Sequence, residues 1–574
     1  MRSMFVSKRT RLITLLVAVL FNLGSNGARN VRPIANLGTR GTGTADALSE
    51  SATTLRDIVA AGRLSDLRWP DFSDYRNQVA NFYDSAGFVP VWFRNNRLTQ
   101  QAQTVIEVLR RADSKGLNAE DYDGSRWADR VDRLPQSSSS VDQARFDAAL
   151  TVCAMRYVSD LHIGRVNPRH FKFNLDVARK KYDLPLFLQE KLVNGVDVRA
   201  ELDRIEPPFE GYKRTQKALQ KYLELSRQDD GEQLPTPAKP VESGGTYDGI
   251  PRLTRLLRLL GDLPDGGALE SSTLYNGPLV AAVKHFQGRH GLSPDGRLGP
   301  GTLKQLNVRL SFRVEQLRLT LERWRWVPYE FSQPPVVVNI PEFRLRAFEK
   351  DGTVALAMNV IVGKAYRHET PVFERDMKFV VFRPYWNVPP SIQRSEIVPA
   401  IKKDRDYIAK KGYEVVTPQG SVVTSGTIND DILQQIGTGK LQVRQKPGPS
   451  NALGLVKLIF PNEYNVYLHS TPSQQLFSQT RRDFSHGCIR VEKPAELAAW
   501  VLRDKPEWSL ERVRAAMQTG KDNAQANLTK AVPVLILYGT AVVDDQNQVH
   551  FFDDIYGYDG ALEKVLALGY PYPG

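Results

Sequence analysis

Two hydrophobic periodicities divide the chain. From about residue 51 to 225, apolar residues recur at the three-to-four spacing of amphipathic helices, as in the run 102–112. From residue 334 onwards the period becomes two, which is typical of strands. The clearest alternating runs are 336–340, 343–348 and 354–362. The sequence therefore predicts a multidomain α+β protein, with a mainly helical N-terminal part and a mostly β C-terminal part.

Shorter patterns mark the connections. Residues 228–247 contain several prolines and glycines and are expected to be a linker or loop. Residues 279–287 and 302–306 have helical spacing and are joined by a turn-rich stretch, 291–300, which predicts a small helical unit. Between residues 394 and 443 the β pattern is interrupted by a polar, helical stretch, and so long an insertion beside a core is often functional.

The N-terminus has the pattern of an export signal. Four basic residues precede a short apolar run, 12–23, and small residues follow it. The run is short for a membrane-spanning helix, so residues 1–28 are expected to be a signal peptide, with an uncleaved inner-membrane anchor as the alternative. Residues 29–50 are rich in Gly, Thr, Ala and Asn and are expected to form a flexible tether. The protein is accordingly expected in the periplasm.

The length and the net charge of the chain limit the number of domains and the kinds of binding partner that are expected. At 574 residues the chain is too long for one core, and three or four domains are expected. Its 77 basic and 64 acidic residues give a net charge of +13, which favours an anionic polymer such as peptidoglycan, or lipid headgroups. The export signal argues against nucleic acid as the partner. We expect a monomer.

The chain has two cysteines in different surroundings. Cys153 lies in an apolar helical run, 148–155, and is expected to be buried and inert. Cys488 lies in the sequence Ser485-His486-Gly487-Cys488-Ile489-Arg490, among polar and glycine residues. A thiol needs a base to become a nucleophile and fixed donors to stabilise the oxyanion that it creates. This segment therefore predicts a cysteine acyltransferase site.

A second histidine completes the candidate site. His469 ends an alternating run, 464–469, so a strand is expected to deliver it next to Cys488 across the fifteen residues 470–484. The order of His before Cys disfavours a papain-type enzyme. Zinc is also disfavoured, because a structural site usually takes four closely spaced ligands and no Cys-x-x-Cys is present. We expect no metal and no cofactor.

The segment 469–490 resembles the signature of the L,D-transpeptidase catalytic domain, a histidine followed at this distance by Ser-His-Gly-Cys, an apolar residue and Asn or Arg. The resemblance implies that Cys488 is the nucleophile and His469 its base, oriented by the carbonyl oxygen of Ser470, where glycine often stands. The backbone amides around Gly487 and Cys488 are implied to form the oxyanion hole. Supporting or substrate-binding roles fall to Ser485, His486, Arg490, Tyr467 and Trp386.

Other segments resemble further parts of the large Gram-negative enzymes of this family. The expected domains are a scaffold (51–227), a linker (228–247), a three-helix peptidoglycan-binding module (248–310), the catalytic domain (330–540) with a lid at about 394–443, and a C-terminal extension (541–574). The alternative for the module is a packing unit that binds nothing.

The resemblance implies a peptidoglycan L,D-transpeptidase that joins the third residues of stem peptides through a cysteine thioester, and so contributes to cell-wall biogenesis and cell shape. Three alternatives remain at this stage. A carboxypeptidase or hydrolase would use the same dyad with water as acceptor. A sortase-like enzyme also has His, Cys and Arg in this order, but the Ser-His-Gly-Cys run disfavours it. A catalytically silent wall-binding protein is disfavoured because both Cys488 and His469 are present.

Overall fold

The computed structural model describes residues 42–134, 139–266, 273–366 and 368–573, and the chain divides into two compact units, Met1–Ala47 and Leu48–Gly574. The expected signal (1–28) and the first part of the expected tether lie outside the described residues. Helix α1 (Thr42–Ala61) begins inside the segment 29–50, so the tether prediction is wrong over its last nine positions. No helix among the described residues is long and apolar enough to cross a membrane.

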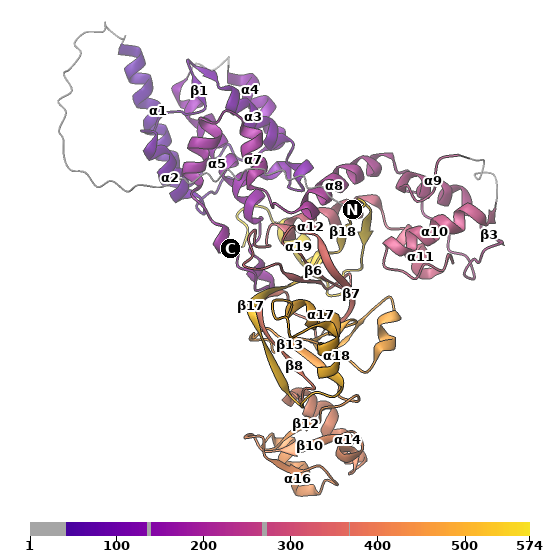
Figure 1. Ribbon diagram of the computed structural model, residues 1–574. Helices are drawn as coiled ribbons and strands as arrows, with labels where there is room; N and C mark the ends of the chain where they lie inside the picture. The colour runs from indigo at the N-terminus through magenta and orange to yellow at the C-terminus, as the bar shows by residue number, and fades with distance from the viewer. Residues whose placement is uncertain (1–41, 135–138, 267–272, 367, 574) are drawn as a thin grey trace, which may run out of the picture. The chain divides into compact units, whose positions relative to one another are not determined.

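The N-terminal part is helical, as the periodicity predicts (Figure 1). Its central helix, α5 (Ser140–Ile163), is buried over nearly its whole length and contains Cys153, whose side chain has no exposed surface. The shorter helices around it are α2 (Arg76–Ser85), α3 (Gln100–Arg110), α4 (Trp127–Arg133) and α7 (Val198–Ile205). They share one hydrophobic core with α5. The interpretation of Cys153 as an inert core residue is consistent with this burial.

The small helical unit has three helices and its own core. They are α9 (Ile250–Leu260), α10 (Gly277–Arg289) and α11 (Pro300–Leu306). The preceding segment, 229–244, has no helix or strand, but it is not a free linker. Leu234 and Val241 are buried in the core of the three helices, and Val241 pairs with Leu298. These two apolar side chains explain why this proline-rich stretch packs against the unit.

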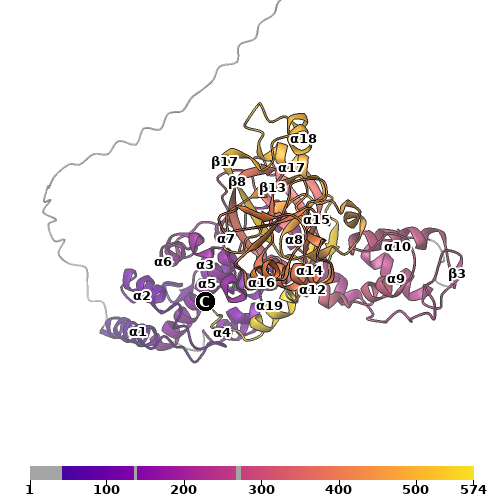
Figure 2. The same ribbon diagram turned by 90° about the horizontal axis from the view of Figure 1, so that it is seen from below.

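The C-terminal β region is one closed sheet. Its strands are β5 (Val336–Asn339), β6 (Arg344–Phe348), β7 (Val354–Gly363), β8 (Phe373–Phe382), β13 (Val456–Ile459), β14 (Leu468–His469), β16 (Ile489–Val491) and β17 (Ala524–Leu537). The strand order is β7-β16-β14-β13-β8-β17-β5-β6, and β6 pairs back with β7. Helices α17 (Pro494–Val501) and α18 (Leu510–Gln518) lie beside β8 and β13 in both views (Figures 1 and 2).

The pleat of this sheet determines which side chains face the core and which face the region around His469 and Cys488. On β13, β14 and β16 the hydrophobic core takes Val456, Leu458, Leu468, Ile489 and Val491. Successive residues of a strand point to opposite faces, so the residues between these apolar positions lie on the other face. They are Lys457, His469 and Arg490. The catalytic histidine predicted from the sequence is thus delivered by the same alternation that fills the core.

The insertion is larger and more regular than the pattern indicates. The prediction of a polar helical stretch at 394–443 is incomplete. The stretch contains helices, but it also contains strands, and the insertion is wider than predicted. The insertion also contains strands, β10 (Tyr413–Val416), β11 (Val422–Thr424) and β12 (Gln442–Gln445), and it is bounded by β9 (Trp386–Asn387) and β12. These form a four-stranded sheet, β11-β10-β12-β9, with a separate hydrophobic core beneath α14 (Val398–Lys403) and α16 (Asp430–Thr438). Short strands with few alternations are hard to read from periodicity.

The C-terminal segment is part of the body of the protein. Strands β18 (Ala541–Val543) and β19 (Val549–Phe551) pack against α8 (Glu210–Gln228) and α12 (Leu310–Trp324), and α19 (Tyr558–Leu566) follows them. Tyr570 is buried with the helical N-terminal core, where its hydroxyl donates to Asp160. The expected extension 541–574 therefore links regions that are far apart in the sequence.

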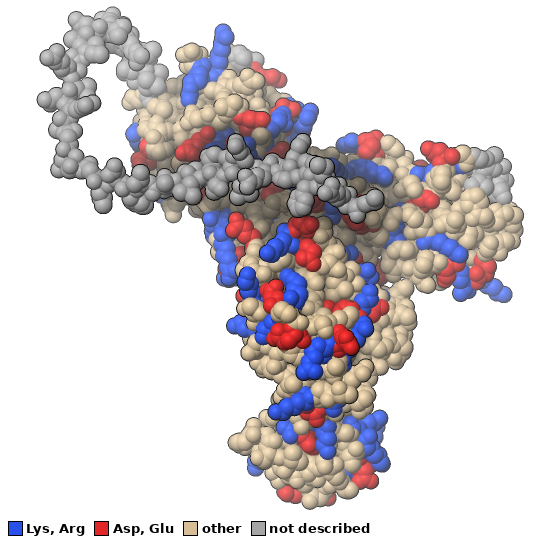
Figure 3. Space-filling model, viewed as in Figure 1, with Lys and Arg blue, Asp and Glu red and all other residues tan. Residues whose placement is uncertain are grey.

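The net positive charge is not gathered into a stripe on the face shown in Figure 3. Basic and acidic side chains alternate over this face. Many of them form ion pairs at the surface, such as Arg375 with Glu463 and Arg514 with Glu496. On this face, therefore, the charged side chains do not form a single polyanion-binding track.

Candidate active site

Cys488 lies in the loop between β15 (Asp483–Ser485) and β16, and its side chain is partly exposed. Gly487, directly before it, has φ +115°, a conformation that side chains rarely adopt. The Ser485 hydroxyl donates to the carbonyl oxygen of Cys488 at 2.5 Å. A glycine therefore permits the turn, and Ser485 holds it closed around the sulfur.

His469 is fixed by its neighbour. It is buried at the end of β14, with 4% of its surface exposed, and its Nδ1 lies 2.6 Å from the carbonyl oxygen of Ser470. A carbonyl oxygen only accepts, so Nδ1 carries the proton and Nε2 has a free lone pair. Burial, with a further effect from Arg490, lowers the pKa of His469 to about 3. The imidazole is therefore neutral at rest, with Nε2 unprotonated.

Strand pairing brings Cys488 to this histidine. Strands β14 and β16 are parallel neighbours, with Leu468 opposite Ile489 and His469 opposite Arg490. The N–H of Ile489 also donates to the carbonyl oxygen of Tyr467 at 3.1 Å. Cys488 thus lies beside the segment that carries Tyr467 and His469, as the prediction of a returning loop requires.

The sulfur is a neutral thiol at rest. It donates to the carbonyl oxygen of Asn465 at 3.6 Å. Burial raises the pKa of Cys488, although hydrogen bonds from the backbone N–H and the hydroxyl of Tyr467, and the charges of Arg490 and Lys457, act in the opposite direction. Both Cys488 and His469 are therefore uncharged at rest.

The predicted oxyanion hole needs one correction. The N–H of Gly487 donates to the Ser485 hydroxyl at 3.1 Å, so this amide is already engaged. The hydroxyl of Tyr467 is hydrogen-bonded to the Cys488 sulfur, so it lies next to the place where a carbonyl group under attack by that sulfur would become an oxyanion. We therefore replace the Gly487 amide with the Tyr467 hydroxyl as a candidate donor, beside the N–H of Cys488.

The remaining predicted residues lie in three places. His486 faces the insertion, where its Nε2 lies 2.7 Å from Oε1 of Glu396, and its ring is 4.6 Å from that of His368. Arg490 is partly exposed beside the dyad, and its Nε is buried without a hydrogen-bond partner. Trp386 pairs with β12 and its ring lies 6.2 Å from that of Tyr413. Among the described contacts Trp386 has none with Cys488, so it belongs to the base of the insertion.

The loop around Cys488 is held from behind by residues that the sequence did not single out. The hydroxyl of Thr370 donates to the carbonyl oxygen of Gly487 at 2.8 Å and accepts from the N–H of Gly363 at 2.9 Å. The hydroxyl of Tyr556, from the C-terminal segment, donates to the carbonyl oxygen of Gly363 at 2.6 Å. A lone threonine or tyrosine carries no sequence signal of its own, so this support is visible only in the fold.

Two further residues near His469 were also missed. Lys457 lies directly opposite His469 on the antiparallel neighbour β13. Gly454 has φ +62°, and a Cβ there would lie 2.5 Å from the hydroxyl oxygen of Ser470. The close approach of Gly454 lets the chain pass behind Ser470, whose carbonyl orients the catalytic ring. In a sequence, a lysine within an alternating strand indicates a solvated side chain, and a single glycine indicates a turn. Neither pattern points to a role near His469.

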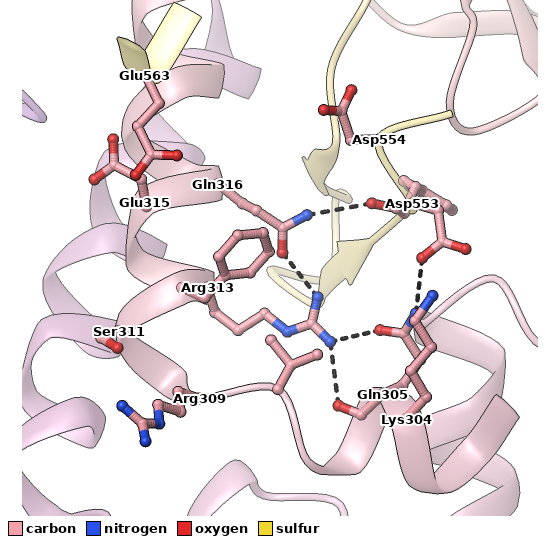
Figure 4. Close-up of a pocket in the computed structure, with 13 residues that line it drawn as sticks. Lys304, Gln305, Arg309, Ser311, Arg313, Glu315, Gln316, Asp553, Asp554 and Glu563 are labelled. Atoms are coloured by element: carbon pink, nitrogen blue, oxygen red, sulfur yellow. Dashed lines mark hydrogen bonds between the residues drawn. The ribbon is translucent and has the colours of Figure 1, made fainter. Parts of the chain in front are cut away.

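Two other parts of the described structure bear on possible chemistry: groups of potential metal ligands and a cavity. Over the described ranges, no group of three His, Cys, Asp or Glu side chains lies close enough to hold a metal ion. A cavity of about 680 Å³ lies between α11–α12 and the segment from Phe552 to Glu563 (Figure 4). There the Arg313 guanidinium is hydrogen-bonded to Gln305 and Gln316, and Gln305 to Asp553. These hydrogen bonds join α11 and α12 to the C-terminal segment.

Comparison with known proteins agrees with this geometry. Residues 334–536 match the family model described as "L,D-transpeptidase catalytic domain". The catalytic region resembles the L,D-transpeptidases. Residues 77–219 match a model described as "Scaffold domain", and residues 247–306 match one described as "Putative peptidoglycan binding domain". The family resemblance seen in the sequence is confirmed over these regions.

A curated relative gives the same result. A protein of Haemophilus influenzae named "Putative L,D-transpeptidase" is 33% identical over 258 residues. The match covers 45% of this chain and 50% of the relative, so the chain spans about half the length of the L,D-transpeptidase-like protein it matches.

Gly454→Ala should disturb the dyad from a distance. The positive φ alone costs about 1–2 kcal/mol, and the added methyl group would also collide with Ser470, which must then move with its carbonyl. We expect a lower Tm and a reduced turnover. The matched control is Gly352→Ala, which has φ +82° and no atom within 4 Å of the added carbon. If both variants lose the same stability and keep full turnover, Gly454 has no role in positioning His469.

Proposed function

We propose that the protein is a periplasmic peptidoglycan L,D-transpeptidase that works through a thioester on Cys488. The observation that carries this proposal is the pairing of a partly exposed thiol with a buried imidazole whose Nδ1 is fixed by Ser470, inside a region that resembles the L,D-transpeptidase catalytic domain. Its substrate would be the stem tetrapeptide of peptidoglycan, and it would need no metal or cofactor.

The chemistry starts from the neutral pair. As the Cys488 sulfur attacks the carbonyl carbon of the third stem residue, Nε2 of His469 accepts the thiol proton. The carbonyl oxygen becomes an oxyanion, which the N–H of Cys488 and the Tyr467 hydroxyl stabilise. The C–N bond then breaks, His469 returns the proton to the leaving nitrogen of the terminal D-alanine, and a thioester remains.

In the second half of the reaction, the steps of thioester formation occur in the reverse order, with a different amine as the attacking group. The side-chain amine of a neighbouring third residue loses its proton to His469 as its nitrogen attacks the thioester carbonyl. The C–S bond breaks, the thiol is restored, and the two third residues are joined. Water at the same position would give a carboxypeptidase, which is the alternative activity with the same residues.

The insertion between β9 and β12 favours the amine over water in this proposal. Its Glu396 reaches His486, two residues from the nucleophile, so the insertion is in contact with the catalytic loop. A covered thioester is less accessible to water. This contact also gives His486 a structural role rather than the role of a base.

The other regions would bring the enzyme to its substrate. The three helices at residues 247–306, which resemble a peptidoglycan-binding domain, would hold the wall without taking part in the chemistry. The expected N-terminal signal would place the protein in the periplasm, either free or attached to the inner membrane.

Mass spectrometry of stem tetrapeptides incubated with the protein tests this function. We expect crosslinked dimer and a thioester adduct on Cys488. Cys488→Ala should abolish both, because no other partly exposed thiol is present. Cys153→Ala, in the core of α5, should keep the adduct. Hydrolysed tripeptide in place of dimer would support the carboxypeptidase, and no adduct on the unmodified enzyme would overturn the proposal.

Replacing the two histidines separately tests their roles. His469→Ala should lower the rate of thioester formation by about 10²–10⁴-fold, since it removes the general base. His486→Ala should leave the chemical step largely intact and change the ratio of hydrolysis to crosslinking, because it cuts the contact with Glu396. Single-turnover kinetics with product analysis separates the two effects. Equal losses of the chemical rate in both folded variants would contradict the assignment.

A further inference from the structure

Two cations flank the catalytic histidine on neighbouring strands. Lys457 lies opposite His469 on β13, and Arg490 lies opposite it on β16. Side chains directly opposite each other on adjacent strands have Cβ atoms roughly 4.5–5.5 Å apart and share a face. Lys457, His469 and Arg490 therefore form a row across three strands, on the face away from the core and beside Cys488.

Ring contacts place the ammonium group of Lys457 at the site. Nζ of Lys457 lies 5.8 Å from the ring centre of Tyr467, whose ring is 5.7 Å from that of His469. Both Lys457 and Arg490 are only partly exposed. Each acts electrostatically on His469 and on Cys488, because each lowers the pKa of both groups. The row thus surrounds the reacting atoms.

Among the described residues, the negative charge that raises the pKa of Lys457 and of Arg490 is that of an ionised Cys488, not of a carboxylate. Across the described parts of the chain, neither Lys457 nor Arg490 makes an ion pair with a carboxylate, and burial lowers the pKa of both. Arg490 also keeps one buried nitrogen, Nε, without a partner. Leaving two partly buried charges uncompensated is costly, so an anion from outside would complete the site. The resting sulfur is not that anion, because it is a neutral thiol bonded to Asn465.

We propose that Lys457 and Arg490 form a carboxylate-binding site for the free C-terminal carboxylate of the donor's leaving residue. This inference rests on the proposed function. It makes the enzyme select donors whose scissile bond is the last peptide bond of the stem.

The geometry of the reaction fits this position. The leaving nitrogen must lie next to Nε2 of His469, which returns its proton. In a C-terminal residue the carboxylate carbon is two bonds from that nitrogen, roughly 2.5 Å away. A carboxylate at that point lies between the side chains of the two residues that flank His469. The carboxylate would also offset the positive charges of Lys457 and Arg490. It would thereby stabilise the imidazolium that forms when His469 takes the thiol proton.

Two donors that differ only at the C-terminus test the inference. One is a stem tetrapeptide ending in D-alanine, and the other ends in D-alaninamide. We expect the unmodified enzyme to form its Cys488 thioester about 10–100-fold faster, in kcat/KM, with the acid, because charge-assisted hydrogen bonds are strong. Lys457→Met should reduce this preference to near unity by slowing the acid donor, and Lys457→Arg should restore part of it.

Controls separate this role from the alternatives. Lys378→Met removes an exposed lysine on the neighbouring strand β8 and should keep the full preference. Alkylation of Cys488 by neutral iodoacetamide reports the thiol pKa directly. Lys457→Met should shift the alkylation profile to higher pH in either case, because Lys457 lowers the pKa of Cys488. If the variant slows the acid and the carboxamide donor equally, the lysine acts on the thiol alone, and the inference is overturned.

The failure of the inference differs from the failure of the proposed function. Equal rates with acid and carboxamide donors in the unmodified enzyme would overturn only the carboxylate site. No thioester with either donor, while iodoacetamide still alkylates Cys488, would overturn the function itself and the inference with it.

Discussion

The pairing register of β13, β14 and β16 is the constraint on which the site depends. One set of alternate side chains fills the core, and the other set presents Lys457, His469 and Arg490 on the opposite face. A shift of one residue in the pairing would bury these three and expose the apolar positions. The burial of Val456, Leu458 and Ile489 therefore fixes the catalytic geometry as well as the fold.

A second constraint is electrostatic. His469 is buried between two cations, and the sulfur lies where burial opposes its ionisation, so the dyad is neutral at rest. A neutral thiol at rest reacts less readily than a thiolate with unrelated electrophiles. Ser470, Gly454 and the Tyr556–Gly363–Thr370 contacts hold the two reacting groups in place. Support from the C-terminal segment makes the last 34 residues part of the catalytic architecture.

The sequence predicted the fold class, which the structure confirms, and it indicated Cys488 and His469 as candidate reactive residues, but it did not indicate the residues that support them. Cys488 and His469 were visible because their residue types and spacing are specific, and the change of period at residue 334 separated the helical from the β regions. Lys457 could not be recognised as a residue of the candidate site, because its place there depends on the pairing of β13 with β14, which sets it opposite His469. The strands of the insertion are too short for a clear alternation, and the engaged amide of Gly487 depends on a local hydrogen bond that no pattern reports.

The neutral resting dyad is the central claim, and the pH dependence of Cys488 alkylation tests it most directly. Burial raises the pKa of Cys488 above its usual range, and the pKa of His469 is lowered to about 3, so the thiolate appears only as pH rises. With iodoacetamide, the rate for Cys488 should increase about tenfold per pH unit between roughly pH 6 and 8, with no plateau below about pH 8.5. A plateau of high reactivity from about pH 5 to 8, lost on replacing His469, would show a thiolate–imidazolium pair and contradict the account.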